Sequence, residues 1–301
     1  MPRPTGVLGE PYRQLQILAT ADLKSKAVSD QILRLALVAL RFLNGDCTRV
    51  DLVSCVAGKR YWAYHVKPTL NLLSRPVNAG LWESDEGKIA EWWRKWRAGE
   101  AMDVMELAKV TYTVAAAYCV AIDLFDRGNK KGPASYFEYY IGHLYAVEIG
   151  TNPRTAVTFE VSGKQVRMTM DLLFVPRDGN KVHVPVKIST RERVVQAWAH
   201  QRILDTAYGR GQFKGLLTVF SETKLDLQKR EVIEICVPDQ WLAYQTHLAI
   251  MDRIYYFDVP KRYIELAEEF PIIVLKQFGQ FFVEKAEVLA HPHASAVPAR
   301  E

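Results

Sequence analysis

The chain has 301 residues, 49% hydrophobic and 24% charged, a composition that supports a substantial buried core and excludes a largely disordered or low-complexity protein. The formal net charge of +5 and the pI of about 8.9 would help association with a polyanion without selecting one. The four scattered cysteines favour free thiols over a zinc site, and the lack of a signal-peptide pattern and of an apolar run of about 18 residues predicts a cytoplasmic protein.

The first 130 residues show helical periodicity. Residues 22–45 place apolar side chains at helical spacing and end at Asn44-Gly45, a helix stop signal. Proline and glycine residues separate further helical patterns, which contain no alternating strand pattern and cover 62–75, 86–98 and 101–126. We therefore predict a mostly helical N-terminal subdomain over residues 1–130.

The pattern changes after the turn residues at 129–133. A short helix over 135–150 precedes three runs with β-type alternation, and Gly-containing turns separate these runs. Such turns favour an antiparallel meander, with strands over 155–161, 165–175 and 181–189. A helix from about Thr190 to Tyr208 is predicted directly after the meander.

Strands and helices alternate in the remaining sequence. Strand patterns cover 215–222, 230–238 and 254–259, with helices from Asp239 and after Pro260. This order predicts an α/β fold in which helices flank a mixed central sheet, in a compact region over 131–290. The tail, 291–301, has little to bury and is predicted to be disordered.

Asp171 lies within an apolar strand, and Lys187 follows it by sixteen residues on the next predicted strand. A carboxylate in such a strand costs several kcal/mol unless it is paired, hydrogen-bonded or bound to a metal. Because the two strands are neighbours in the meander, Lys187 can be its partner. The pair can be a purely structural ion pair or part of a catalytic site.

The order of these residues resembles the core of the PD-(D/E)XK nucleases: a helix with Glu138, a strand with Asp171, a strand with Lys187 and then a helix. The resemblance implies that Asp171 holds Mg²⁺, that Lys187 orients the attacking water, and that Glu138 points to the same site as a second metal ligand. Carboxylate oxygens suit Mg²⁺, and an ammonium group stabilises developing negative charge. Glu138 can equally be a charged side chain that the helix exposes to solvent, with no role in a site.

A sharper motif starts at the lysine: residues 187–196 read K-x-S-x-R-E-R-x-x-Q. It resembles the branch of type II restriction endonucleases that reads CC/GG-containing sites, in which an Arg-Glu-Arg triplet follows the catalytic lysine. The resemblance implies that Arg191, Glu192 and Arg193 read G·C pairs and that Gln196 keeps its place on the helix. Arginine can donate two hydrogen bonds to guanine, and glutamate can accept one from cytosine. The alternative to a reading role is that these three residues are simply the charged first turn of the predicted helix.

The sequence departs from this pattern at the second acidic residue. Pro185 occupies the position two before Lys187, where the superfamily usually has an acid. The CC/GG branch moves that acid to the next helix, thirteen or fourteen residues after the lysine, where this chain has His200 and Gln201. Those two residues are candidates for contact with DNA, the metal or its water. The candidate substitute carboxylates, in order, are Glu138, Glu160 and Asp205.

The sequence therefore predicts a Mg²⁺-dependent, site-specific deoxyribonuclease that hydrolyses phosphodiester bonds of double-stranded DNA. Symmetric sites imply a homodimer, and the resemblance implies a cognate DNA methyltransferase as genetic partner. The N-terminal subdomain would serve dimerisation or DNA contact. Two alternatives stay open: a repair or junction-resolving nuclease of the same superfamily, and a non-catalytic DNA-binding protein on a decayed nuclease core.

Two N-terminal segments mix aromatic and basic residues. The segment 92–97, Trp-Trp-Arg-Lys-Trp-Arg, fits either a surface that contacts the DNA backbone or, more often for tryptophans at helical spacing, a core. The segment 58–62, Gly-Lys-Arg-Tyr-Trp, fits a phosphate-contacting turn or a solvated loop. Neither segment is assigned a function from the sequence.

Overall fold

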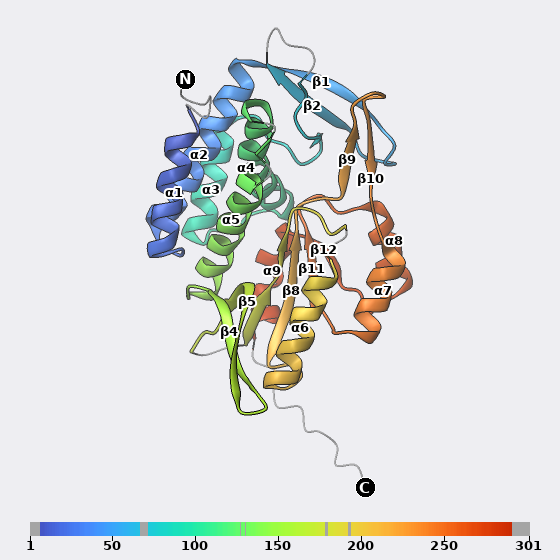
Figure 1. Cartoon of the computed structure of the whole chain (residues 1–301). Helices are drawn as coiled ribbons and strands as arrows, with labels where there is room; N and C mark the ends of the chain where they lie inside the picture. The colour runs from blue at the N-terminus through green and yellow to red at the C-terminus, as the bar shows by residue number, and fades with distance from the viewer. Residues whose placement is uncertain are drawn as a thin grey trace.

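The computed structural model describes residues 7–66, 72–126, 128–129, 131–177, 180–191 and 194–290. Within these ranges, helices α1 to α5 pack side by side on one flank, and a mixed sheet carries helices on both of its faces (Figure 1). The predicted α/β class with a mixed sheet is confirmed. The predicted tail, 291–301, lies outside the described residues.

The N-terminal helices begin and end at the residues that sequence signals favour. Ser25 caps one helix through the backbone N–H of Val28, and Asp103 forms a capping box with Glu106 at the start of another. Gly99 ends a third helix with φ 72°, the left-handed conformation that glycine adopts readily. The helices are α1 (Gly9–Ala21), α2 (Lys26–Gly45), α3 (Glu86–Ala98), α4 (Val104–Phe125) and α5 (Lys131–Ile149).

Helix α4 forms the centre of the helical flank. It is long and apolar enough to cross a membrane, but 89% of its most apolar window is buried inside the protein. It packs against α2, α3, α5 and α9 (Gly279–Leu289). Such a helix is what the centre of a large core requires, since it is covered on all sides.

The helix predicted over 62–75 is wrong. Tyr61–Val66 is instead a strand, β2, which pairs antiparallel with β1 (Cys47–Ser54) and β3 (Val77–Asn78). The aromatic and β-branched residues of β2 suit a pleated surface, and Tyr61 and Ala63 are buried in a small cluster with Val232. Pairing with the neighbouring strands β1 and β3, together with burial against the distant Val232, therefore overrode the local helical pattern.

This N-terminal hairpin belongs to a sheet that it shares with the C-terminal half. Strand β1 pairs parallel with β10 (Glu231–Glu234), which pairs antiparallel with β9 (Thr223–Asp226). The largest hydrophobic cluster likewise joins residues before and after position 130. The division near residue 130 stays a prediction, and the two ranges share both a sheet and a core.

The central sheet contains the predicted meander. Strands β4, β5 and β6 are antiparallel, and the turn between β4 and β5 places Ser162 and Gly163 at positive φ, as a tight hairpin requires. Strands β8, β11 and β12 continue the sheet in parallel. The strands are β4 (Arg154–Val161), β5 (Lys164–Phe174), β6 (Lys181–Val184), β7 (Val186–Lys187), β8 (Phe213–Val219), β11 (Arg253–Tyr256) and β12 (Leu275–Gln277).

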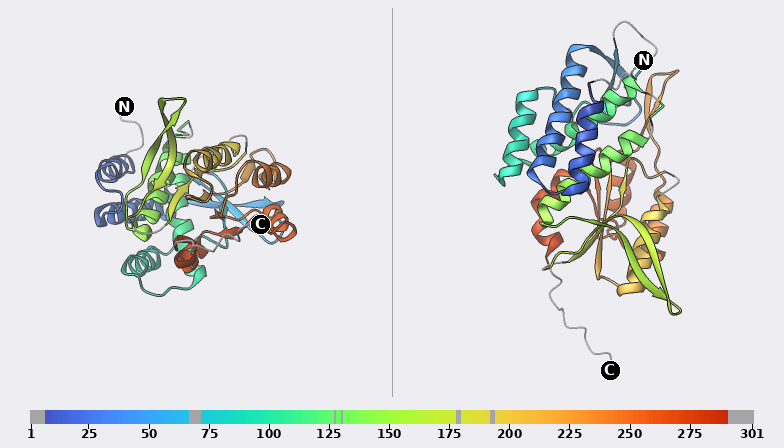
Figure 2. Two further views of the ribbon diagram at one scale, coloured as in Figure 1. Left: turned by 90° about the horizontal axis from the view of Figure 1, so that it is seen from below. Right: turned by 60° about the vertical axis from the view of Figure 1, so that its left-hand side comes forward.

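Alternation along the strands separates the two faces of this sheet. On β8, Leu216 packs into the cluster formed with α4, α5 and α9, whereas Leu217 packs into the cluster formed with α6, α7 and α8. Figure 2 shows the β4–β5 hairpin projecting beyond these layers. The helices on the second face are α6 (Val195–Tyr208), α7 (Pro238–His247) and α8 (Lys261–Glu269). Helix α6 thus begins five residues later than Thr190, where it was predicted to start.

Candidate active site

Pro185 creates the local geometry of the site. It has no N–H for a ladder bond and lies between β6 and β7, so the strand is interrupted there. Pairing with β5 ends at Val184, while β8 continues beside β7 and donates from the N–H of Thr218 to the carbonyl of Pro185, at 2.9 Å. The residue that replaces the expected acid therefore opens the sheet beside Lys187.

Asp171 fills this opening from β5. Its Oδ2 accepts hydrogen bonds from the N–H of Val186, at 3.0 Å, and from Nζ of Lys187, at 2.6 Å. The Asp171 side chain is 21% exposed and the Lys187 side chain 16%. The structure therefore brings the two predicted residues together where β5 and β7 separate inside the sheet, at an opening that solvent can still reach.

Glu138 faces the same place from α5. Together with Asp171 it lines a cavity of about 420 Å³ between the end of α1, α5 and β5. Its carboxyl pKa is raised, first because nearby protein removes solvent and second because Asp171 is negative, while Lys187 acts in the opposite direction. Two carboxylates and one ammonium group thus share one electrostatic environment.

The other candidate carboxylates lie elsewhere. Glu160 is exposed and pairs with Gln165, six residues before Asp171 along β5, which is roughly 20 Å at the rise of an extended strand. Asp205 accepts a hydrogen bond from Nε2 of Gln201 at 3.1 Å. Among the three carboxylates, Glu138 is therefore the one that lines the cavity with Asp171.

Gln201 has a structural position. It is 1% exposed, and its Nε2 also donates to the carbonyl of Phe213 at 2.9 Å. Its Oε1 accepts from Nδ1 of the buried His183 at 3.0 Å. Because these bonds use the amide within the protein, the predicted contact of Gln201 with DNA or metal has no support in this geometry.

The two histidines near the site differ in exposure. Burial lowers the pKa of His183 to about 4, so its ring is neutral. His200, on α6, is half-buried, and its ring centre lies 6.3 Å from that of His183. Burial also lowers the pKa of His200, with smaller opposing effects from Asp171 and Lys187. His200 is therefore close enough to the pair to sense both of its charges.

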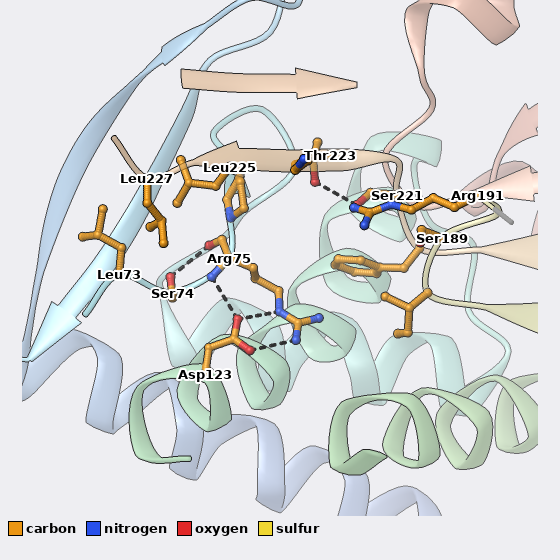
Figure 3. Close-up of a pocket in the computed structure, with 14 residues that line it drawn as sticks. Leu73, Ser74, Arg75, Asp123, Ser189, Arg191, Ser221, Thr223, Leu225 and Leu227 are labelled. Atoms are coloured by element: carbon orange, nitrogen blue, oxygen red, sulfur yellow. Dashed lines mark hydrogen bonds and ion pairs between the residues drawn. The ribbon is translucent and has the colours of Figure 1, made fainter. Parts of the chain in front are cut away.

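The predicted reading triplet is described in part. Arg191 is exposed, whereas Glu192 and Arg193 lie outside the described residues. Gln196 is exposed on the first turn of α6. Arg191 and Ser189 line one side of a second cavity, of about 400 Å³, and three leucines line the other (Figure 3).

Arg75 and Asp123 form an ion pair in this second cavity that the sequence did not predict. Nε of Arg75 donates to Oδ2 of Asp123 at 2.7 Å, and a terminal nitrogen donates to Oδ1 at 2.9 Å. The guanidinium is held in a fixed plane by this two-point contact. No local signal could have revealed it, since the partners are 48 residues apart in the sequence.

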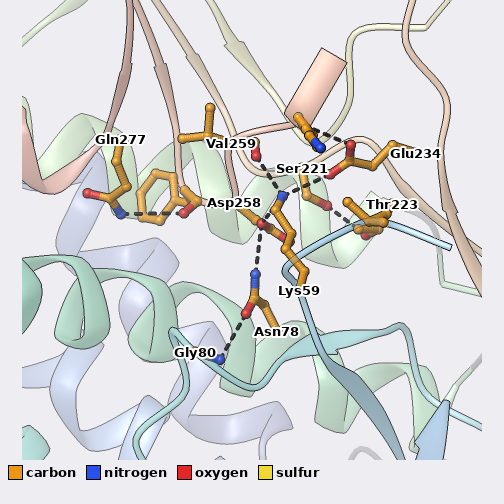
Figure 4. Close-up of polar contacts among 12 residues, drawn as sticks. Lys59, Asn78, Gly80, Ser221, Thr223, Glu234, Asp258, Val259 and Gln277 are labelled. Carbon is orange, nitrogen blue, oxygen red and sulfur yellow. Dashed lines mark hydrogen bonds and ion pairs between the residues drawn. The ribbon is translucent and has the colours of Figure 1, made fainter. Parts of the chain in front are cut away.

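The two aromatic and basic segments also have defined places. Trp93 and Trp96 are buried, so the core interpretation of 92–97 is confirmed. Lys59 is not part of a solvated or phosphate-contacting loop, because its ammonium group donates to Glu234 at 2.8 Å and to Asp258 at 2.7 Å (Figure 4). Asp258 also accepts from Asn78 and Tyr61. This buried network joins the N-terminal hairpin to the C-terminal strands.

Two solved structures are similar to this chain. The crystal structure of the type IIP restriction endonuclease Kpn2I aligns with a TM-score of 0.77 and 22% identity, covering 93% of this chain and 97% of that one. The complex of the restriction endonuclease PspGI with substrate DNA aligns with a TM-score of 0.42 and 13% identity, covering 67% and 92%. No family model and no curated protein sequence matches the chain. The chain therefore has the fold of Kpn2I, and the aligned region covers most of residues 1–130 of this chain.

Proposed function

We propose that the protein is a divalent-metal-dependent endonuclease of the type II restriction class, which cuts double-stranded DNA at a G·C-containing site of the CC/GG type. The observation that carries this proposal is the Asp171–Lys187 pair at the opening between β5 and β7, with Glu138 facing the same cavity. The fold supports it, since the similar chain Kpn2I is a type IIP restriction endonuclease.

The residues present fit a hard divalent cation such as Mg²⁺. Asp171 and Glu138 would hold it through carboxylate oxygens, and phosphate and water oxygens would complete its shell, as is usual for Mg²⁺. The described residues contain no group of three or more His, Cys, Asp or Glu side chains placed to hold a metal by themselves. When bound, the ion would polarise the scissile phosphate and lower the pKa of water beside it.

The side chains divide the remaining tasks. Lys187, fixed by Asp171 at 2.6 Å, would position the attacking water and stabilise negative charge as the phosphate is attacked. Arg191, Glu192 and Arg193 would read base edges in the major groove, with Gln196 beside them. His200 would contact the DNA near the cleaved bond, because its half-buried ring senses the charges of both Asp171 and Lys187.

A two-fold symmetric DNA site requires two active sites, one for each strand, so we propose a homodimer. The net charge of +5 supports a DNA partner. A restriction enzyme also requires protection of host DNA, so a cognate DNA methyltransferase is proposed as the genetic partner and the cytoplasm as the location.

Incubation of the purified protein with plasmid and phage DNA, in Mg²⁺ or in EDTA, tests this function. Discrete fragments that appear only with Mg²⁺ support it, and sequencing of their ends would give the recognition site. A smear of fragments, or selective cutting of branched DNA, would favour a repair or junction-resolving nuclease. Ends without G·C content would contradict the CC/GG assignment.

The second candidate function is a DNA-binding protein that has lost cleavage. Pro185 in place of the usual acid and the internally bonded Gln201 favour it, because neither supplies a carboxylate to the site. This candidate predicts sequence-specific binding in EDTA and intact DNA after long incubation with Mg²⁺ or Mn²⁺. Cleavage that is lost in a Glu138→Gln variant would eliminate it.

A further inference from the structure

The reading segment is the proposed base-reading triplet, which begins at Arg191. Residues 188–190 connect Lys187 to this segment, and they begin alongside the end of β8. The N–H of Phe220 donates to the carbonyl of Lys187 at 3.0 Å, and the N–H of Ser221 donates to that of Ile188 at 3.1 Å. These bonds extend the pairing beyond the ends of both strands, to Ile188 after β7 and to Phe220 and Ser221 after β8. The pairing then stops, because Glu222 presents its side chain to the next part of the stretch.

Glu222 binds Thr190 through a single carboxylate oxygen. Its Oε1 accepts from the N–H of Thr190 at 2.8 Å, from the Thr190 hydroxyl at 2.6 Å and from the Tyr256 hydroxyl at 2.7 Å. Glu222 and Tyr256 are fully buried, and Thr190 is 1% exposed. Thr190 is therefore fixed in the core directly before the exposed Arg191.

Burial of the Glu222 carboxylate costs free energy, and an apolar residue could fill the same space without that cost. A buried carboxylate costs several kcal/mol in desolvation, and Oε2 of Glu222 has no hydrogen-bond partner among the described residues. Burial raises the pKa of this carboxyl, and the hydrogen bonds from Thr190 and Tyr256 oppose that change, with a smaller effect from the charge of Arg191. A threonine that only needed to be buried would not require an acidic partner.

The other side of the triplet is also fixed. Val194, the N-terminal flanking residue of α6, is 1% exposed and packs in the cluster with Trp198. Among the described residues, no side chain caps this helix start. Thr190 and Val194 thus flank the triplet in sequence as two buried anchors, and the first depends on Glu222.

We propose that Glu222 is a positioning residue for DNA reading: by holding Thr190, it sets the place of Arg191 relative to Lys187. This inference rests on the proposed function. It assigns to Glu222 the discrimination between DNA sequences, whereas Lys187 and Asp171 determine the cleavage rate.

The test uses the full-length protein and four variants. Glu222→Ala removes the acceptor, Glu222→Gln keeps an oxygen at the same place, and Thr190→Val removes one of the hydrogen bonds. Asp258→Asn is the matched control, because Asp258 is an equally buried carboxylate with side-chain partners in the Lys59 network instead of the reading segment. Folding is checked by circular dichroism and thermal melting.

Binding is measured in EDTA with a pool of short DNA duplexes that have randomised central base pairs, followed by sequencing of the bound fraction. Glu222→Ala and Thr190→Val should lower the enrichment of the wild-type motif about tenfold, the scale of one lost base contact, with total binding of the pool nearly unchanged. Glu222→Gln and Asp258→Asn should keep the wild-type enrichment. Unchanged enrichment in Glu222→Ala, or an equal loss in Asp258→Asn, would overturn the proposal.

Hydrogen exchange of the backbone amides gives a second readout that needs neither DNA nor activity. The amide of Thr190 should exchange faster in Glu222→Ala and at the wild-type rate in Glu222→Gln. Equal protection in all variants would contradict the anchoring role even if the protein is a nuclease. Conversely, a wild-type protein that enriches a motif but never cuts would refute the nuclease function and leave the role of Glu222 in place.

Discussion

At the scale of single residues, the contact between Asp171 and Lys187 combines two properties. It is a close ion pair of low exposure, at 2.6 Å, while the cavity beside it keeps Asp171 accessible. A purely structural pair would not need a third charged group, yet Glu138 lies in the same electrostatic field. This arrangement of three groups is the reason for the catalytic interpretation.

Replacement of Lys187 should separate cutting from binding. Lys187→Ala removes the ammonium group that we propose stabilises developing charge, and the loss of one such group lowers rates by roughly 10²–10³-fold. Binding to the recognition sequence in EDTA should change little, since the reading residues are untouched. Lys26→Ala, at an exposed lysine on α2, is the control for activity. Cleavage by Lys187→Ala at the wild-type rate would show that the active site lies elsewhere.

Replacement of Arg193 should affect one base pair. If Arg193 donates two hydrogen bonds to a guanine, Arg193→Ala should cost about 1–3 kcal/mol of discrimination at that pair. The check compares the binding of duplexes that differ at single positions of the site found for the wild-type enzyme. Arg210→Ala, at an exposed arginine after α6, should lower all affinities equally or not at all. A uniform loss for Arg193→Ala would mean that this residue contacts phosphate.

His143 should make stability depend on pH. Its Nδ1 donates to the carbonyl of Leu23 at 2.7 Å, and its buried Nε2 has no partner in the described part of the chain. Burial lowers the pKa of His143 to about 4. The unfolded chain, with a histidine pKa near 6.5, binds the proton first, so stability is full above about pH 6.5 and falls toward pH 4. Between pH 7.5 and 5, this histidine should cost about 2 kcal/mol.

Urea unfolding at the two pH values tests this effect. His143→Asn keeps a donor near Leu23 but cannot titrate, so its unfolding free energy should fall by about 2 kcal/mol less than that of the wild type. His247→Asn, at an exposed histidine on α7, should behave as the wild type does. An identical pH dependence in His143→Asn and the wild type would contradict the assignment.

At the scale of elements, close packing between β8 and α6 determines where His200 lies. Gly215 on β8 leaves room for Gln201, and an added Cβ would lie 2.9 Å from Oε1 of Gln201 and 2.7 Å from the sulfur of Met251. Gln201 in turn holds His183. The absence of a side chain at position 215 therefore allows α6 to pack closely on the sheet beside the proposed active site.

Gly215→Ala should consequently destabilise the protein by about 1–3 kcal/mol, the usual cost of overpacking a core. Its cleavage rate should also fall, because α6 must shift. Gly45→Ala is the matched control, since nothing lies within 4 Å of the added Cβ at the end of α2, and it should be neutral or slightly stabilising. Chemical denaturation measures both, and wild-type stability in Gly215→Ala would show that the interface can adapt.

The distance in sequence between partners decided which elements and site residues could be predicted. The β4–β5–β6 meander and the pair Asp171–Lys187 rest on neighbouring strands, so alternation and turn residues were sufficient. The strand β2 has its buried partner Val232 about half the chain away, and its local pattern favoured a helix. No periodic pattern in the sequence indicates the contacts of Glu222 with Thr190 and of Arg75 with Asp123. These contacts could therefore be found only in the structure.

At the scale of the whole molecule, the N-terminal and C-terminal halves are joined by a shared sheet, a shared core and the Lys59 network. Nζ of Lys59 donates to Glu234, Asp258 and the carbonyl of Val259. The Lys59 side chain is 17% exposed, and those of Glu234 and Asp258 are 6% and 3% exposed. Because the proposed active site is built from β5, β7 and α5, with α1 at its cavity, both halves must be in place for this arrangement to form.

The molecule should therefore unfold as one cooperative unit. Calorimetry of the wild type should give a single transition whose calorimetric and van't Hoff enthalpies agree, as expected for two-state unfolding. Lys59→Ala should lower the unfolding free energy by about 3–5 kcal/mol, because it leaves buried carboxylates without their partner. Lys88→Ala, which breaks an exposed pair with Glu83 at 3.6 Å, should cost no more than about 1 kcal/mol. Two separate transitions in the wild type, with Lys59→Ala shifting neither, would mean that residues 1–130 fold independently and that the shared sheet is a contact between two domains.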